Sequence, residues 1–157
     1  MIFVTTGTQL PFPRLIAAMN DLAPELDEKI IAQIGPDDGT YSNLEIADHL
    51  APAAFEDTFR QARIIVAHAG IGTILSAKRL AKPLVLVPRR HDQGEHRNDH
   101  QIATAQAVAG RTGLHVAWQV SDLKPLLTNP DLTPADDAPG PAHDALTGFL
   151  KSYIDGL

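Results

Sequence analysis

Short apolar runs rich in β-branched residues recur along this chain, separated by stretches long enough for one helix each. Runs that are apolar throughout indicate strands buried on both faces, as in a parallel sheet covered by helices. The pattern predicts six strands, at Ile2–Thr6, Lys29–Ile34, Leu44–Ala47, Arg63–His68, Leu84–Pro88 and Leu114–Trp118. It predicts helices at Phe12–Leu22, Ala53–Gln61, Thr73–Leu80, Asn98–Ala109 and Ser121–Leu127. Because each helix provides a crossover, residues 1–128 are expected to form one doubly wound, Rossmann-like α/β domain with a mostly parallel sheet.

The composition excludes several kinds of protein. The 157 residues include no cysteine, which removes disulfides, zinc–thiolate sites, iron–sulfur clusters and thiol nucleophiles. The 13 Lys+Arg against 19 Asp+Glu give a net charge of −6, so no overall positive field attracts nucleic acid. No apolar run approaches the ~20 residues that cross a bilayer, and the first residues, MIFVTTGT, enter a strand without a basic stretch or cleavage site. We therefore expect a cytoplasmic protein with no membrane segment of its own.

The composition changes after residue 128. Asn129–Asp144 contains four prolines, four aspartates and no lysine or arginine, and it is predicted to be an extended surface connection, called the tether below. Residues 145–157 follow the tether and predict an amphipathic helix. Its apolar stripe consists of Leu146, Phe149, Leu150, Tyr153, Ile154 and Leu157. Two destinations for this stripe stay open at this point: a partner subunit, or the domain's own sheet.

Three loops at the carboxyl ends of predicted strands carry unusual residues, and ligands of open parallel sheets bind at these ends. The first loop, Thr5–Gln9, contains Gly7, which permits close approach of a ligand to the backbone. The hydroxyls of Thr6 and Thr8 can donate hydrogen bonds to that ligand. The alternative interpretation is an ordinary tight turn between a strand and a helix.

The second loop, His68–Thr73, opens a predicted helix. Gly70 and Gly72 remove side chains from the turn, Thr73 is a candidate helix cap, and unpaired backbone N–H groups at the helix start favour an anion. Leu75 occupies the third glycine position of a dinucleotide-binding fingerprint, so that resemblance is weak. His68 at the strand end is either a ligand contact or a packed histidine.

The third loop, Pro88–Gln101, is the richest in functional groups: fourteen residues hold three of the seven histidines, three arginines and three acids. His96 and His100 are four residues apart, with Glu95 nearby, which allows a metal site as an alternative, but no third ligand at a fixed spacing can be named. Hydrogen bonding to sugar hydroxyls uses the same loop more economically. The residues for that role are Glu95, Asn98, Asp99, His100 and Gln101. We expect no metal ion and no cofactor.

With these loops identified, the sequence resembles the C-terminal, donor-binding domain of glycosyltransferase family 28 in its free-standing form. The resemblance rests on VTTGTQLPFPRLI (Val4–Ile16), QIG (Gln33–Gly35), HAGIGTI (His68–Ile74), KPLVLVPRR (Lys82–Arg90) and EHRNDHQ (Glu95–Gln101), in the family's order. Free-standing members form one half of a split GT-B enzyme. Examples are the cytosolic subunit of the dolichol-pyrophosphate N-acetylglucosamine transferase and its bacterial exopolysaccharide counterparts.

The resemblance implies transfer of a hexosyl or N-acetylhexosaminyl group from a UDP-sugar to a lipid-linked acceptor. It places the diphosphate at His68–Thr73, with Arg89 as a further candidate, and the sugar at Glu95–Gln101. A membrane-associated partner subunit is expected to bind the acceptor, hold this chain at the inner membrane face and supply most of the catalytic base. Within this chain the candidates for the base are Glu95 and His96.

One position departs from the family pattern. Ser76 stands, in an ungapped alignment, where a two-domain member of the family has a glutamate that holds the ribose. Two other functions stay open on the residues alone. An NADP-binding module would place pyrophosphate at Gly70 and Gly72 and the 2′-phosphate at Arg89 and Arg90. A non-catalytic nucleotide-sugar sensor would need the same pocket as a transferase.

Overall fold

The computed structural model describes residues 1–137 and 141–156 of the chain. Six parallel strands form one sheet in the order β3-β2-β1-β4-β5-β6. The strands are β1 (Ile2–Thr5), β2 (Ile30–Gln33), β3 (Glu45–Ala47), β4 (Ile64–His68), β5 (Leu84–Val87) and β6 (Leu114–Val116). The predicted fold class is confirmed: this is a single doubly wound α/β domain whose strand order reverses between β1 and β4.

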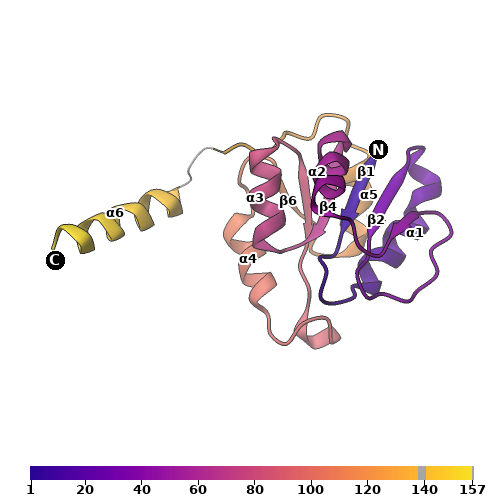
Figure 1. Ribbon diagram of the computed structural model, residues 1–157, viewed down its shortest axis with the longest axis horizontal. Coiled ribbons are helices and arrows are strands. Elements are labelled where there is room, and N and C mark those ends of the chain that lie inside the picture. The colour runs from indigo at the N-terminus through magenta and orange to yellow at the C-terminus, as the bar shows by residue number, and fades with distance from the viewer. Residues whose placement is uncertain (138–140, 157) are drawn as a thin grey trace.

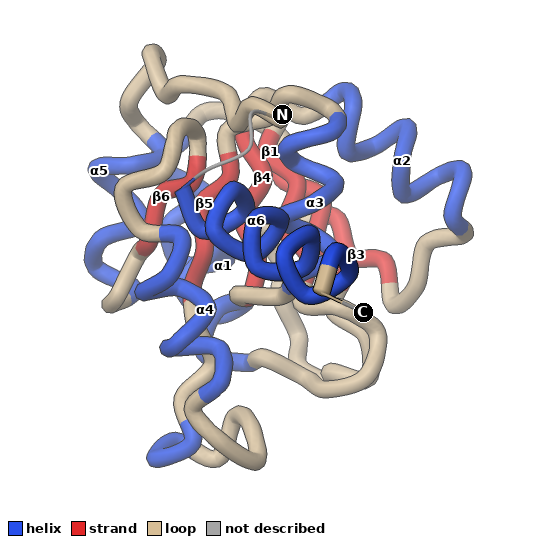
Figure 2. Tube along the Cα trace, turned by 90° about the vertical axis from the view of Figure 1, so that its left-hand side faces the viewer, coloured by secondary structure: helices blue, strands red, loops and turns tan. Residues whose placement is uncertain are grey.

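Helices cover both faces of the sheet (Figures 1 and 2). The helices of the domain are α1 (Pro13–Leu26), α2 (Pro52–Gln61), α3 (Ile71–Arg79), α4 (His100–Val108) and α5 (Leu123–Leu127), with short 3-10 turns η1 (His91–Gln93) and η2 (Val120–Asp122). The packing clusters put α1 and α5 against one face, and α2 and α3 against the other. All five helices lie at the predicted places, with boundaries that differ by no more than four residues.

The strands are buried on both faces because successive side chains alternate between two cores. In β1, Ile2 and Val4 pack in one cluster with α1 and α5, whereas Phe3 packs in the other with Phe59 of α2. Both clusters consist of apolar side chains that are almost fully buried. This double burial explains why the strands read as continuous apolar runs in the sequence.

Helix α1 continues through Pro24 to Leu26, beyond its predicted end at Leu22. A proline inside a helix removes one N–H donor and leaves the carbonyl four residues earlier without its partner. Here that carbonyl, of Asn20, accepts a hydrogen bond from the side-chain amide of Asn43 at 3.0 Å. A residue on a distant loop therefore replaces the missing bond, which the local sequence does not reveal.

The first part of the tether differs from the expectation that it would not join a core. Ala135 is buried in the second cluster and its N–H donates to the Lys82 carbonyl at 3.1 Å, while Leu132 packs against the first cluster. A Cβ atom on Gly113 would lie only 2.0 Å from the Ala135 nitrogen, so the glycine makes room for this segment. One small residue reaches the core although the segment as a whole is polar.

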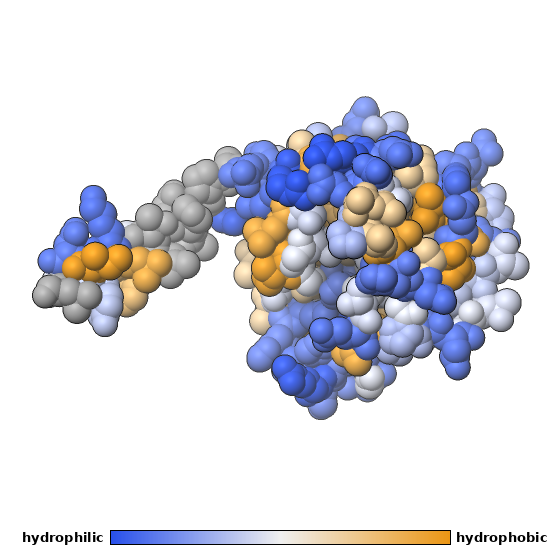
Figure 3. Space-filling model, in the orientation of Figure 1, coloured by the Kyte–Doolittle hydropathy of each residue, from blue (hydrophilic) through white to orange (hydrophobic). Residues whose placement is uncertain are grey.

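A last helix, α6 (Pro141–Asp155), follows and takes in residues 141–144 of the predicted tether. Proline is favoured at the first position of a helix, which accounts for the earlier start. Residues 138–140 of the tether and Leu157 of the stripe lie outside the described residues. Phe149, Leu150, Tyr153 and Ile154 are all exposed, and Figure 3 shows apolar side chains on the surface of α6. Figure 1 shows α6 apart from both helical layers.

Candidate functional site

The topology brings the three predicted loops to one edge of the sheet. They leave the carboxyl ends of β1, β4 and β5, which are neighbouring strands. Thr5 of β1 pairs with Ala67 of β4, and His68 of β4 pairs with Val87 of β5, so the three strands end level with one another. The site therefore lies beside the reversal of strand order, where open α/β sheets bind ligands.

Two adjoining hollows lie at this edge. The first, about 220 Å³, is bordered by the loop Thr6–Leu10 and by His68, Arg89, His96 and Gln101. The second, about 570 Å³, is bordered by Gln9, Leu10 and residues 94–97. Gln9, Leu10 and His96 border both hollows. The hollows therefore meet between the loop after β1 (Thr6–Pro11, the β1 loop) and the loop after β5 (Pro88–Gln101, the β5 loop). Residues from all three predicted loops contribute to this region.

His68 lies between two of the predicted glycines. A Cβ on Gly7 would approach the ring carbon Cε1 of His68 to 3.1 Å, and a Cβ on Gly70 would approach its Nε2 to 2.4 Å. Burial, together with the nearby charges of Arg89 and His96, lowers the pKa of His68 to about 4, so the ring is neutral at pH 7. Its Nδ1 is buried and has no hydrogen-bond partner among the described residues. His68 thus both packs against the glycines and borders the first hollow.

The start of α3 differs in one respect from the prediction. Gly70 occupies the N-cap position and its N–H donates to the His68 carbonyl at 2.8 Å, so Thr73 is the third helical residue and not the cap. The first intrahelical bond in this turn comes from the N–H of Ile74. As at other helix starts, the N–H groups of residues 71–73 have no acceptor within the helix and carry the positive end of its dipole. A Cβ on Gly72 would meet no atom within 4 Å, so this face is open.

The β1 loop has a second neighbour that the sequence did not single out as a site. Gly7 adopts a positive φ of 79°. A Cβ on Gly35, after β2, would lie 3.2 Å from the carbonyl oxygen of Gly7. Gln33 is buried and donates from Nε2 to Thr5 Oγ1 at 3.2 Å. Gln33 and Gly35 stood in the family motif QIG, which was the only sequence signal for them. The β2 loop therefore supports the β1 loop from the side away from β4.

Arg89 is 2% exposed, and its guanidinium is engaged by backbone carbonyls. Nη1 donates to Pro11 O at 2.6 Å and to Glu95 O at 3.4 Å, and Nη2 donates to Thr6 O at 2.9 Å and to Leu10 O at 2.8 Å. The guanidinium also lies 4.6 Å from the ring centroid of Phe12. Burial lowers the pKa of Arg89 below its usual value, against the opposing effect of Glu95. The side chain predicted to meet a diphosphate thus directs most of its donors at the β1 loop.

Glu95 is also engaged within the protein. Its carboxylate accepts two hydrogen bonds from Arg14, at 2.5 Å and 3.0 Å, and one from the Arg90 backbone N–H at 2.9 Å. The side chain of Glu95 is 8% exposed. Arg14, in the first turn of α1, was not predicted as a site residue, because an arginine at a helix start gives no local sign of a distant acidic partner. The structure joins Glu95 to Arg14 instead of presenting it to solvent.

The rest of the β5 loop combines internal bonds with exposed groups. Gln101 Oε1 accepts from the backbone N–H groups of Ala69 at 3.2 Å and Arg89 at 3.0 Å, which ties the β4 and β5 loops together. Asp99 Oδ1 accepts from the His91 N–H at 3.1 Å, and Asn98 Oδ1 accepts from the His100 N–H at 3.1 Å. His96 borders both hollows, with Nδ1 3.0 Å from Asn98 Oδ1. Within residues 1–137 and 141–156, no three His, Asp or Glu side chains form a metal-binding group.

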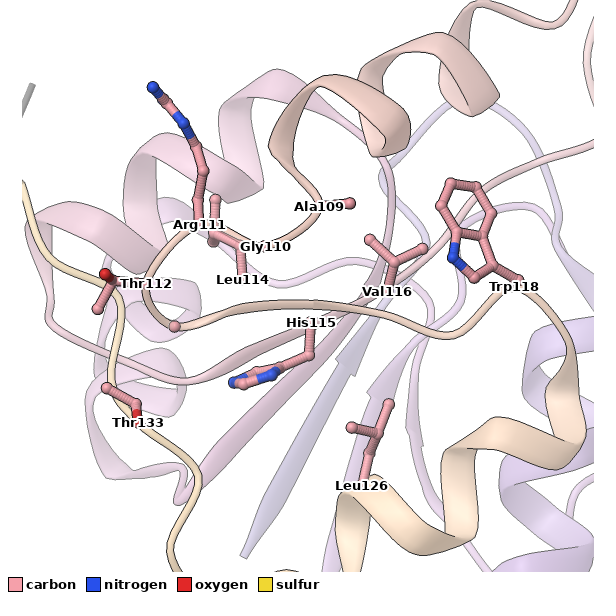
Figure 4. A pocket seen from close by; sticks show the side chains of 11 residues that line it. Ala109, Gly110, Arg111, Thr112, Leu114, His115, Val116, Trp118, Leu126 and Thr133 are labelled. Carbon is pink, nitrogen blue, oxygen red and sulfur yellow. The ribbon is translucent and has the colours of Figure 1, made fainter. Parts of the chain in front are cut away.

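A larger groove, about 590 Å³, lies elsewhere, along the edge strand β6 (Figure 4). Figure 4 shows His115 on this strand, with Trp118 at one end of the groove and Leu126 on the neighbouring helix. His115 Nε2 is buried without a partner among the described residues. This groove contains none of the predicted site residues.

Comparisons with known proteins agree with this geometry. The model of the glycosyltransferase family 28 C-terminal domain matches residues 1–129. The chain belongs to this family. The family-28 domain accordingly includes the whole sheet and all three site loops, and it ends where the tether begins. No curated protein matches the sequence.

Solved structures share the fold at low sequence identity. The glycotransferase of kitacinnamycin matches with a TM-score of 0.63 and 21% identity over 96% of this chain and 38% of its own. The Streptomyces sp. SF2575 glycosyltransferase SsfS6, complexed with thymidine diphosphate, matches with a TM-score of 0.55 and 16% identity over 99% of this chain and 37% of its own. The solution structure of ALG13 matches with a TM-score of 0.55 and 16% identity over 95% of this chain and 94% of its own. The chain thus spans a little over a third of the two longer glycosyltransferases and nearly all of ALG13. None of the described helices is long and apolar enough to span a membrane.

Proposed function

We propose that this chain is the donor-binding part of a GT-B glycosyltransferase that uses a UDP-sugar and acts with a partner subunit. The observation that carries the proposal is the open start of α3, two residues beyond His68 of the first hollow, in a domain of glycosyltransferase family 28. A helix start with unpaired N–H groups favours a diphosphate. The hollows beyond it, between the β1 and β5 loops, have room and polar groups for the sugar.

The chemistry requires a leaving group that is stabilised and a hydroxyl that is activated. The acceptor oxygen forms a bond to the anomeric carbon while the bond from that carbon to the diphosphate oxygen breaks, and UDP departs with the electron pair. The N–H groups of residues 71–73 would meet the charge that develops on UDP. The proton of the acceptor hydroxyl passes to a general base. The leaving group therefore needs no metal ion in this proposal.

For the base, the structure favours His96 over Glu95 within this chain. His96 borders both hollows, whereas the Glu95 carboxylate already accepts three hydrogen bonds from Arg14 and Arg90. A base on the partner subunit remains our principal proposal, because a GT-B site lies between two such domains and residues 1–129 form one of them. For the sugar, we propose contacts from the Gln101 amide nitrogen, His96, Asn98 and His100.

We further propose that the partner is membrane-associated, binds a lipid-linked acceptor and contacts α6, which would hold this chain at the inner membrane face. Phe149, Leu150, Tyr153 and Ile154 are between 48% and 67% exposed. Full burial of such a side chain contributes roughly 1.5–3 kcal/mol, so a covering surface would bind α6 strongly. Ile71 and Leu75, one turn apart on α3 beside the site, are also exposed and offer a second contact.

Nucleotide binding tests the first half of the proposal. Calorimetry of the full chain should show binding of UDP and of UDP-sugars, weaker binding of thymidine diphosphate, and none of NADP. NADP binding without UDP binding would support the alternative of an NADP module. That alternative uses Arg89 for the 2′-phosphate, whereas in the structure the Arg89 guanidinium donates to backbone carbonyls. UDP-sugar binding without transfer after the partner is added would favour a sensor.

Deletion of Pro141–Leu157 tests the second half. The deletion should leave the thermal midpoint and the UDP affinity nearly unchanged, because the described side chains of α6 lie outside both cores, and it should abolish co-purification with the partner from the native host. A matched variant, Phe149→Ser with Ile154→Ser, should have the same effect while keeping the helix. A large fall in midpoint with partner binding intact would show that α6 belongs to this domain.

A further inference from the structure

The β1 loop, Thr6–Pro11, borders both hollows but has little internal structure to hold it. The N–H and hydroxyl of Thr6 reach Gln33 O at 3.1 Å and 3.4 Å, and Gly7 N–H reaches Thr5 Oγ1 at 3.4 Å. No regular element lies between β1 and α1. The Thr6 carbonyl is buried, and those of Leu10 and Pro11 lie in partly buried contacts, so they need donors from elsewhere, because an unpaired buried carbonyl is costly.

Arg89 provides those donors. Its two terminal nitrogens reach three carbonyls of the loop, those of Thr6, Leu10 and Pro11, at 2.6–2.9 Å. A planar guanidinium presents several donors in a fixed fork, which a lysine ammonium cannot reproduce. The backbone N–H of Arg89 is itself fixed by Gln101 Oε1, which also accepts from the loop after β4. Arg89 therefore bonds directly to the loop after β1 and is linked to the loop after β4 through Gln101.

One further contact holds the Arg89 guanidinium in place, and it is shared with Arg14. The Phe12 ring, fully buried at the start of α1, lies 4.6 Å from the guanidinium of Arg89 and 5.3 Å from that of Arg14. Arg14 in turn binds Glu95 and donates to the Pro88 carbonyl at 3.1 Å. The loop, the start of α1 and the β5 loop thus form one connected arrangement around Arg89.

We infer that Arg89 is a positioning residue: it fixes the Thr6–Pro11 loop in the conformation that binds the donor nucleotide, and it does not itself contact the diphosphate. This inference rests on the proposed function for the identity of the ligand. The part of the inference that concerns the loop conformation does not depend on which ligand binds.

The test replaces Arg89 with lysine, which keeps the charge and loses the fork. In the free Arg89→Lys protein, the backbone amides of Thr6 and Gly7, which donate to Gln33 O and Thr5 Oγ1, should exchange with deuterium at least tenfold faster, and UDP affinity should fall at least tenfold. The matched control is Arg90→Lys: Arg90 is adjacent in sequence and its side chain pairs with Asp92, so neither measurement should change.

Two outcomes would overturn the inference, and a third would refute only the proposed function. Loss of affinity with unchanged exchange would make Arg89 a direct ligand and overturn the inference. Faster exchange with wild-type affinity would also overturn it, because the loop conformation would then not matter for binding. Faster exchange in a protein whose wild type binds no UDP would support the role of Arg89 in the loop and refute only the proposed function.

If Arg89→Lys does not fold, the wild-type protein still provides the test. Side-chain nitrogen NMR should resolve separate, slowly exchanging Nη–H signals for Arg89 and averaged signals for Arg90. Addition of UDP should leave the Arg89 signals nearly unshifted while shifting the amides of residues 71–73. Averaged Arg89 signals, or a large shift of them on UDP addition, would overturn the inference.

Discussion

The loops after β4 and β5 lie side by side yet use their residues in opposite ways. The β4 loop has few polar side chains, and what it presents is backbone: the start of α3, with Gly72 open to solvent. The β5 loop is dense in polar side chains, but Arg89, Glu95, Asp99 and the side-chain oxygen of Gln101 bond within the protein. A high density of polar residues in the sequence therefore did not mean that those groups are available to a ligand.

The difference follows from the cost of buried polar groups. A loop of side chains near the sheet must satisfy each buried donor and acceptor, and it does so most readily with its own neighbours. A helix start always leaves several N–H groups without an internal acceptor, so its capacity for an anion persists in the folded state. The β4 loop is thus suited to binding and much of the β5 loop to holding the site in shape.

The comparison is tested most severely by Gly70→Val. A side chain there would overlap His68 Nε2, 2.4 Å from the Cβ position, so we expect a loss of about 2–3 kcal/mol in stability and of UDP binding together. Thermal unfolding and calorimetry measure the two effects. A variant with wild-type stability would show that His68 can move aside, and the packing of the β4 loop would need revision.

Gly72→Val separates ligand binding from packing within the same loop. A Cβ there meets no atom of the protein, so the thermal midpoint should change little, whereas UDP affinity should fall at least 30-fold, about 2 kcal/mol. Gly72→Ala is the matched control and should have a smaller effect on affinity. Wild-type affinity for UDP in the valine variant would mean that the diphosphate binds elsewhere.

The histidine at the base of the β4 loop predicts a dependence of stability on pH. Because the pKa of His68 is about 4 in the folded protein and about 6.5 when unfolded, the unfolded state binds more protons between these values. Stability should therefore fall as pH drops from 6.5 to 4, by about 2 kcal/mol after allowance for the partly exposed ring. Denaturant unfolding of His68→Gln should lack this component, and His100→Gln should retain it. Equal slopes in all three proteins would contradict the buried, neutral ring.

On the β5 side, Glu95→Gln should alter stability more than binding. The change weakens the bonds from Arg14 and the Arg90 N–H, so we expect a loss of about 1 kcal/mol and less than a threefold change in UDP affinity. Unfolding and calorimetry on the same samples provide the measurement. If stability is unchanged and transfer by the assembled enzyme is abolished, Glu95 is the base and not a structural residue.

The smallest expected effect is that of chelation. Removal of metal ions by EDTA should leave UDP-sugar binding and transfer by the complex with the partner unchanged, because the described residues contain no three-membered group of metal-binding side chains. Activity lost with EDTA and restored by zinc would instead support the alternative of a site at His96 and His100.

The sequence by itself determined the sheet, its helices and the positions of the three loops. Runs apolar on both faces can be buried only between two layers, so the strands at Ile2, Ile64 and Leu84 were evident from local pattern alone. The turns at Gly7, Gly70 and Gly72 and the fold class were predictable for the same reason, because each depends on residues close together in the chain, whereas the packing of His68 between Gly7 and Gly70 does not.

Only the tertiary structure decided which polar groups bond to one another within the protein. The partners of Glu95 and Arg89 lie on the β1 loop and α1, 78 or more residues away along the chain for Arg14, Pro11 and Thr6. Likewise, the Asn20 carbonyl that Pro24 leaves unpaired is satisfied by Asn43, and Ala135 of the polar tether reaches the core over Gly113. Hydrogen bonds form between groups that the fold brings together, and a local pattern records the presence of a donor or acceptor but not its partner.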